Sequence, residues 1–64
     1  MEDIKRLREA QGKTQKQLAD EMGVERSTVA KWEAGTAFPR ADKLPKLAEV
    51  LGCSVADLFD IESA

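Results

Sequence analysis

Apolar residues recur at helical spacing on both sides of Gly23, between residues 15 and 34. They stand at i, i+1 and i+4 before the glycine and at i and i+3 after it, as Leu18, Ala19, Met22, Val29 and Trp32. Apolar positions three or four residues apart form one stripe along an α-helix. The pattern therefore predicts two short amphipathic helices that meet at a tight turn, and it places Trp32 in the core.

The first of these helices carries signals at both of its ends. Thr14 and Gln17 have the spacing of a capping box, in which each side chain bonds the backbone N–H of the other residue. Gly23 can adopt the left-handed conformation that ends a helix, and Ala19 is small where the second helix must cross closely. An ordinary helical hairpin and a helix-turn-helix share this pattern, and the spacing alone leaves both open.

The rest of the chain predicts three further helices. One covers residues 1–11 and ends at Gly12. A second runs from an Asp42 cap to residue 51 with Pro45 in its first turn, where the missing N–H costs little, and a third follows a Ser54 cap. Their inward residues are Ile4, Leu7, Leu44, Leu47, Ala48, Leu51, Val55, Leu58 and Phe59. No period-two run of β-branched residues occurs, so we predict one all-α domain of five helices over residues 1–64.

Particular residues also carry a resemblance to a known family. They are Leu7-Arg8, Thr14-Gln15, Leu18-Ala19, Met22-Gly23-Val24, Val29, Trp32-Glu33-Ala34-Gly35, Pro39, Leu47-Ala48, Leu51-Gly52 and Asp57-Leu58. With them the chain resembles the Cro and phage-repressor type of helix-turn-helix protein, the Xre family. The resemblance implies a compact five-helix, lambda-repressor-like DNA-binding domain with its helix-turn-helix motif at residues 15–34. In such proteins the second helix of the motif enters the DNA major groove, and the first crosses the backbone.

Arg8 stands four residues after Ile4 on the same helix face, so its head group should reach into the domain and need an acidic partner there. The resemblance implies that this partner is Glu33, in a partly buried ion pair that braces the motif. The alternative is that the two are unrelated surface charges.

The face opposite Val29 and Trp32 supplies the expected base contacts. At about 100° per residue, Ser27 and Lys31 lie on that face with Arg26 at its flank. Glu25 precedes them where relatives commonly carry a serine or threonine cap. Glutamate is a poor cap, but its carboxylate can accept from a cytosine amino group. The residues expected to contact bases are Glu25, Arg26, Ser27 and Lys31.

A second set of residues is expected at DNA phosphates, at the edges of the motif and in the loop after it. The set consists of Thr14, Gln15, Thr28, Thr36 and Arg40. Gln15 stands at the positive start of its helix, which favours an anion. For Arg40 the alternative, a merely solvated side chain, stays open.

The net charge of −2 argues against a nucleic-acid partner, because phosphate neutralisation usually requires an excess of Lys and Arg. The distribution weakens that objection. Residues 1–46 hold all ten basic residues against eight acidic ones, and residues 47–64 hold the other four acidic residues. The acidic end should face away from DNA, so we expect a homodimer interface there, at Leu58, Phe59 and Ile61.

Catalysis is not expected from this composition. The chain has no His, no Tyr and one Cys, and its acidic residues are spread along helices, so a general base with a paired nucleophile is missing. No spacing suggests a metal site, a cofactor or a small-molecule ligand, and Cys53 is expected to be a small buried packing residue. No apolar run approaches the ~20 residues of a membrane span, and we expect a cytoplasmic protein.

Two functions remain. The first is a sequence-specific regulator of transcription, a repressor that binds double-stranded DNA as a homodimer on a palindromic operator, with half-sites about 34 Å apart. The second is a protein-interaction module, such as an antitoxin-like adaptor with weak or no DNA binding, and the low net charge is its main support.

Overall fold

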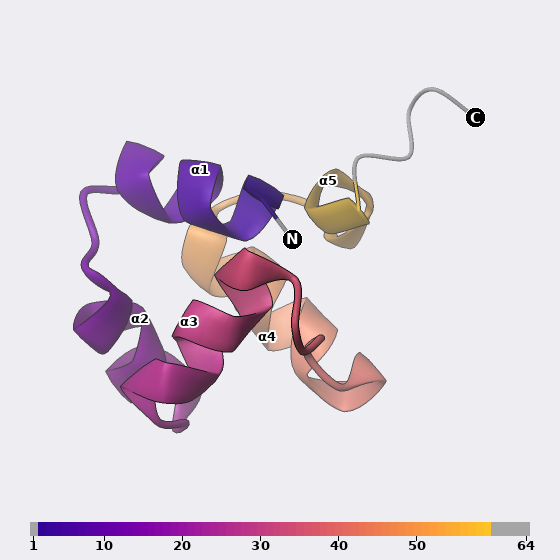
Figure 1. Cartoon of the computed structure of the whole chain (residues 1–64). Helices are drawn as coiled ribbons and strands as arrows, with labels where there is room; N and C mark the ends of the chain where they lie inside the picture. Colours follow the sequence, from indigo (N-terminus) through magenta and orange to yellow (C-terminus); the bar gives the residue numbers. More distant parts are fainter. Residues whose placement is uncertain (1, 60–64) are drawn as a thin grey trace.

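The computed structural model describes residues 2–59, excluding the side chains of Glu2 and Phe59. These residues form five α-helices and one short 3-10 helix, with no strand among them (Figure 1). The elements are α1 (Glu2–Ala10), α2 (Gln15–Met22), α3 (Arg26–Ala34), η1 (Ala41–Lys43), α4 (Leu44–Leu51) and α5 (Val55–Phe59). The all-α prediction is therefore confirmed.

The turn between α2 and α3 has the predicted caps. The Thr14 hydroxyl accepts from the Gln17 N–H at 3.0 Å, and the Gln17 side-chain oxygen accepts from the Thr14 N–H at 2.8 Å. Gly23 has a φ of 71°, and the next N–H, that of Val24, donates to Ala19 O at 3.0 Å. This closing bond satisfies a carbonyl at the end of α2 and sets the direction in which the chain enters α3.

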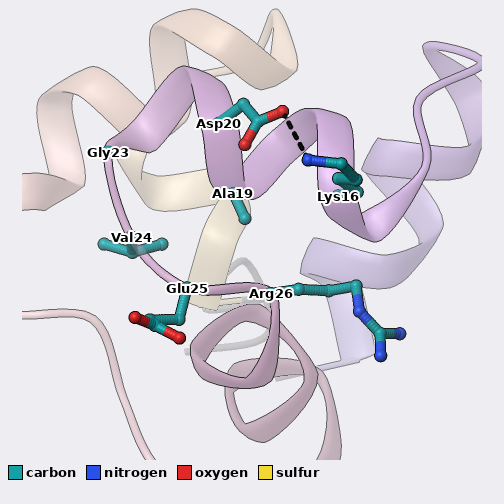
Figure 2. A pocket seen from close by; sticks show the side chains of 7 residues that line it. All are labelled: Lys16, Ala19, Asp20, Gly23, Val24, Glu25 and Arg26. Carbon is teal, nitrogen blue, oxygen red and sulfur yellow. Dashed lines mark hydrogen bonds and ion pairs between the residues drawn. The ribbon is translucent and has the colours of Figure 1, made fainter.

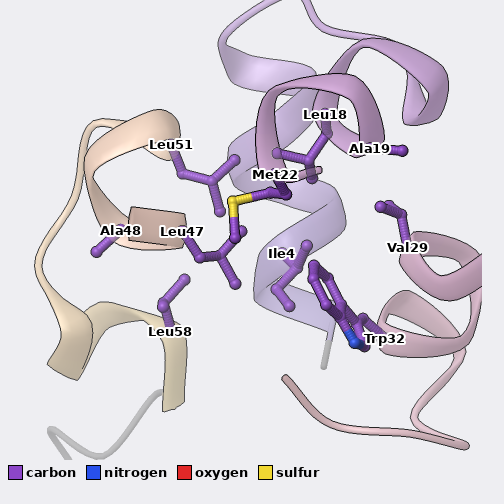
Figure 3. Packing of buried hydrophobic residues seen from close by; sticks show 10 residues of the cluster. All are labelled: Ile4, Leu18, Ala19, Met22, Val29, Trp32, Leu47, Ala48, Leu51 and Leu58. Atoms are coloured by element: carbon purple, nitrogen blue, oxygen red, sulfur yellow. The ribbon is translucent and has the colours of Figure 1, made fainter. Parts of the chain in front are cut away.

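All five α-helices contribute to one hydrophobic core (Figure 3). It consists of Ile4, Leu18, Ala19, Met22, Val29, Trp32, Leu47, Ala48, Leu51 and Leu58. α3 packs against both α1 and α2, and α4 packs against α5. Trp32 is 3% exposed, as expected for a core residue. Because Val29 and Trp32 fix one face of α3 in this core, the opposite face of the helix is directed outward.

The start of α4 differs from the prediction. Asp42 does not cap it, because residues 41–43 form the 3-10 helix η1, and the residue before α4 is Lys43, which makes no side-chain cap. The Leu44 N–H instead donates to Ala41 O, and Pro45 stands in the first turn as expected. The proline has no N–H to satisfy, so this helix start needs less from a cap.

α5 has the predicted serine cap, in a reciprocal form. Asp57 N–H donates to Ser54 Oγ at 3.2 Å, and Ser54 N–H donates to Asp57 Oδ2 at 3.1 Å. Leu58 is 1% exposed and lies in the core, so the expectation that it offers surface to a second copy is wrong. The Phe59 side chain and Ile61 lie outside the described residues. Cys53 is half-buried against the core, less enclosed than expected.

Candidate nucleic-acid interface

The outward face of α3 brings together three of the predicted base-contacting residues. Arg26, Ser27 and Lys31 are all exposed. No hydrogen bond or ion pair engages their side chains within residues 2–59. Their polar groups are therefore available to an external partner, on a helix whose other face is fixed in the core.

Glu25, the fourth of these residues, precedes the first turn of α3. Its backbone is extended, with a φ of −77° and a ψ of 151°, and its side chain makes no cap hydrogen bond. The expectation of a poor cap is confirmed. Because the carboxylate does not close the helix, it stays exposed beside Arg26, with its acceptor oxygens unused within the described chain.

The expected phosphate contacts vary in how free they are. Thr14 Oγ1 already accepts from Gln17, although its own O–H can still donate. Gln15 Nε2 donates to Glu33 Oε1 at 3.0 Å, and the Thr36 hydroxyl makes a long bond of 3.4 Å to Lys31 O. Thr28 is half-buried. Of these five residues, only Arg40 is exposed and has no side-chain partner in the described part of the chain.

Arg8 and Glu33 form the predicted ion pair between α1 and α3. Arg8 Nε lies 2.6 Å from Glu33 Oε2, and Nη2 lies 3.2 Å from Oε1, so the pair is bidentate. Arg8 Nη1 also donates to Lys13 O at 2.7 Å. The side chains are 10% and 5% exposed, so water screens the pair only weakly. The pair connects α1, the loop before α2 and the last turn of α3.

The same contacts determine the ionisation of both residues. Burial opposes the charged form of Glu33, but the hydrogen bonds from Arg8 and Gln15, together with the positive charges of Arg8 and Lys5, outweigh burial and hold the pKa of Glu33 below its ordinary value. The hydrogen bond to Glu33 raises the pKa of Arg8. Both groups are charged at neutral pH, and Gln15 is part of this network, which sequence reasoning did not find.

A hollow of about 550 Å³ separates the outer side of α2 from the start of α3 (Figure 2). Its lining residues are Lys16, Ala19, Asp20, Gly23, Val24, Glu25 and Arg26. Figure 2 shows Lys16 and Arg26 at one end of the hollow, whereas the Glu25 carboxylate points toward the other. Lys16 Nζ lies 3.3 Å from Asp20 Oδ2. Sequence reasoning did not single out Lys16, because lysine and aspartate four residues apart are typical of a solvated helix face.

Basic side chains without an ion pair concentrate in one segment. Within residues 2–59, the basic residues that form ion pairs are Arg6 and Arg8 in α1, Lys13 in the loop after it, and Lys16 in α2. From residue 26 to residue 46, by contrast, no basic side chain has an acidic partner in the described part. These residues are Arg26, Lys31, Arg40, Lys43 and Lys46. The segment that contains α3 is therefore locally positive although the whole chain is not.

Other kinds of site find no support in the described residues. No group of three or more His, Cys, Asp or Glu side chains among them could hold a metal ion. None of the helices in this part of the chain is long and apolar enough to cross a bilayer.

Comparison with known proteins gives one family match, a helix-turn-helix model (HTH_3) that covers residues 4–58. The CTXphi transcriptional repressor RstR of Vibrio cholerae is 37% identical over 57 residues, which are 89% of this chain and 51% of RstR. The prophage-derived HTH-type transcriptional regulator YonR of Bacillus subtilis is 38% identical over 83% of this chain and 49% of its own length. The HTH-type transcriptional activator BcrR of Enterococcus faecalis is 30% identical over 95% of this chain and 30% of its own length. The chain thus spans between 30% and 51% of the length of these relatives, and no solved structure matches it.

Proposed function

The chain belongs to the Xre and Cro type of helix-turn-helix transcription regulators, which bind DNA and are not enzymes, and we propose that it is a sequence-specific repressor. It binds a palindromic operator as a homodimer, with α3 in the major groove. The observation that carries the proposal is the outward face of α3, where Arg26, Ser27 and Lys31 are exposed and have no partner within residues 2–59.

Each residue on that face has a chemistry suited to a base edge. Arg26 and Lys31 can donate to the O6 and N7 acceptors of guanine, and Arg26 can do so with two bonds. Ser27 can donate to or accept from any base. Glu25 can accept from the cytosine N4 amino group, since its carboxylate is not used as a cap. The four residues would then distinguish base pairs along the first two turns of α3.

The phosphate contacts hold α3 in register. Thr14 and Gln15 at the start of α2 would lie against one strand, and Thr36 and Arg40 after α3 would lie against the backbone beyond it. Thr28 adds a hydroxyl at the edge of the groove. Such contacts position a protein on the duplex and carry no sequence information of their own.

Repression is the mode that this domain supports most simply. RstR is named a repressor and BcrR an activator, so the relatives include both modes. Occupying an operator needs only a DNA-binding surface, which α3 supplies, whereas activation needs a further contact with the transcription machinery. Since its target is operator DNA, the protein would act in the cytoplasm.

A homodimer would double the number of bases contacted and match a palindrome. We place its interface at the C-terminal end, with Phe59 and Ile61 as predicted and with Val55 in place of the buried Leu58. Val55 was expected to point inward from its spacing, but it is 38% exposed on α5. Half-sites one turn of the duplex apart, about 34 Å, would allow both copies of α3 to enter the same side of the DNA.

The test is selection of bound duplexes from a random pool at physiological salt, followed by a salt titration on the selected sequence. We expect a palindromic preference and a linear fall of log affinity with log salt. Failure to enrich any sequence would overturn the proposal.

That failure would favour a protein-interaction module of the antitoxin-like kind. The observations on its side are the net charge of −2 and Phe38, which is 67% exposed in the loop after α3. Substituting Phe38 by Ser would then abolish partner binding, whereas the DNA-binding proposal assigns Phe38 no role.

A further inference from the structure

Two lysines near α2, one exposed and one half-buried, pair with carboxylates of that helix in different surroundings. Lys16 Nζ lies 3.3 Å from Asp20 Oδ2, with side chains that are 74% and 66% exposed, and both residues line the hollow beside α3. Lys13 Nζ lies 3.1 Å from Glu21 Oε1, and neither of these residues lines that hollow. The two pairs have the same charges, and they differ in their exposure and in whether they line the hollow beside Arg26.

We propose that the hollow between α2 and α3 binds a DNA backbone phosphate, that Lys16 is the ligand of this phosphate, and that Asp20 holds Lys16 in the free protein. The inference rests on the proposed function, because it needs α3 to approach a duplex. It adds a contact outside the residues that read bases, and it assigns Asp20 a role in setting affinity.

The shape of the hollow fits a phosphodiester group at its cationic end. The inner surface consists of small or short side chains at Ala19, Gly23 and Val24, and a volume of about 550 Å³ exceeds what one phosphate needs. Figure 2 shows Lys16 and Arg26 on the same side of the hollow, with Lys16 Nζ turned toward Asp20 and the Arg26 guanidinium pointing away from α2. An anion at this end would bind Lys16 once that lysine turns away from Asp20, and Arg26 adds positive charge to the same side of the hollow. At the other end it would meet the carboxylate of Glu25.

The exchange of partners costs little on the protein side. An exposed ion pair four residues apart on a helix contributes little to stability, because water screens it and the side chains lose entropy in forming it. A phosphate offers Lys16 an equivalent anion and releases a condensed counterion from DNA. Asp20 competes with the phosphate for Lys16, so it lowers affinity for every sequence alike and leaves sequence preference unchanged.

The test measures affinity against salt for wild type and for Lys16→Ala, Asp20→Asn, the double variant and Glu21→Gln, on the selected operator and on an unrelated duplex. Lys16→Ala should remove about one phosphate contact. The factor by which affinity falls between about 50 and 200 mM salt should therefore be roughly three- to fourfold smaller for this variant than for wild type. Asp20→Asn should tighten binding to both duplexes by the same factor. Glu21→Gln makes the same charge change on the same helix, and it should have a clearly smaller effect.

The double variant separates partner exchange from simple repulsion. If Asp20 acts by holding Lys16, the gain from Asp20→Asn should shrink when Lys16 is alanine. An unchanged salt slope in Lys16→Ala, equal effects of Asp20→Asn and Glu21→Gln, or a gain that persists in full in the double variant would each overturn the inference.

Arg26→Ala is measured in the same experiments, as a control for the proposed function. If it relaxes sequence preference while Lys16→Ala leaves the slope unchanged, this inference fails and the proposed function stands; if no sequence is preferred by wild type, both fail.

Discussion

The Glu33 carboxylate accepts three hydrogen bonds, from Arg8 Nε, Arg8 Nη2 and Gln15 Nε2. Each donor comes from a different helix than Glu33 itself, so one side chain joins α1, the start of α2 and the last turn of α3. A nearly buried carboxylate is stable only while its charge is compensated in this way. The orientation of α3 therefore depends on contacts that lie away from its outward face.

Removing one member of the pair should cost more than removing both. Arg8→Ala or Glu33→Ala leaves a nearly buried charge without its partner, and we expect a loss of about 3 kcal/mol for each, the low end for buried pairs. Arg8→Met with Glu33→Leu should cost less than either. A double-mutant cycle by chemical denaturation measures this, and strict additivity would show that the two charges do not act as a pair.

The depressed pKa of Glu33 also gives stability a dependence on pH. A group whose pKa is lower in the folded state contributes fully above its unfolded pKa, and the contribution is lost as the pH falls through the folded pKa. The stabilisation should therefore be complete at neutral pH and decline below the ordinary value of 4.5. Denaturation at a series of pH values should show a shallower acid-side decline for Glu33→Gln than for wild type. Parallel curves would contradict the shift.

Spacing explains which of these residue contacts were predictable. Arg8 lies on the inward face of its helix, and the family resemblance named Glu33 as its partner. The bond from Gln15 to Glu33 was not predictable, because it depends on how the start of α2 packs against the end of α3. Lys16 was missed for a similar reason, since the hollow exists only once both helices are in place.

Three helices end at a glycine with positive φ, and two of these glycines differ in what surrounds them. Gly23 and Gly52 have φ values of 71° and 70°. A Cβ at Gly23 would meet nothing within 4 Å, whereas one at Gly52 would lie 2.8 Å from Gln11 Nε2. That amide donates to Leu51 O at 3.2 Å, so the end of α1 also caps the end of α4.

The two glycines form a matched pair for substitution by alanine. Gly23→Ala should lower the free energy of unfolding by roughly 1–2 kcal/mol, which is the cost of holding a residue with a Cβ in the left-handed backbone conformation. Gly52→Ala should cost about 1 kcal/mol more, because it also displaces Gln11 from Leu51 O. Chemical denaturation measures both, and the excess should disappear in a Gln11→Ala background. Equal losses in the wild-type background would show that the Gln11 contact contributes nothing.

Element boundaries were predictable where a cap uses local side chains. Thr14 with Gln17 and Ser54 with Asp57 bond residues three apart, and the first pair and the Ser54 cap were both predicted from the sequence. The start of α4 was not, because η1 satisfies the chain with backbone bonds that leave no signature in side-chain type. Asp42 looked like a cap only because it preceded a proline at the right distance.

The net charge of the whole molecule does not reflect how unevenly its basic and acidic residues are distributed. The net value is −2, yet five basic side chains between residues 26 and 46 lack an acidic partner within the described part, and Glu49 and Asp57 lie in the segment that follows. In Figure 1, α2 and α5 lie at opposite ends of the molecule. A DNA-binding side and a side for a second copy can thus coexist on a very small domain.

The dimer should depend on Val55 and not on Phe38. These are the two large apolar residues that are exposed among the described residues, at 38% and 67%. Val55→Asp should weaken association by placing a charge in the interface, whereas Phe38→Ser should leave it unchanged. Sedimentation equilibrium measures the dimer constant, and circular dichroism checks the fold. A dimer lost with Phe38→Ser and kept with Val55→Asp would reverse the assignment.

The most direct test of the central claim, that α3 reads bases through its outward face, is selection of bound duplexes with wild type, Arg26→Ala and Arg40→Ala in parallel. If the claim holds, Arg26→Ala loses about 1–3 kcal/mol of discrimination at one base pair of each half-site and leaves the other positions as they were. Arg40→Ala weakens binding to all sequences alike and reduces the salt slope by about one. An unchanged preference and affinity for Arg26→Ala would contradict the claim.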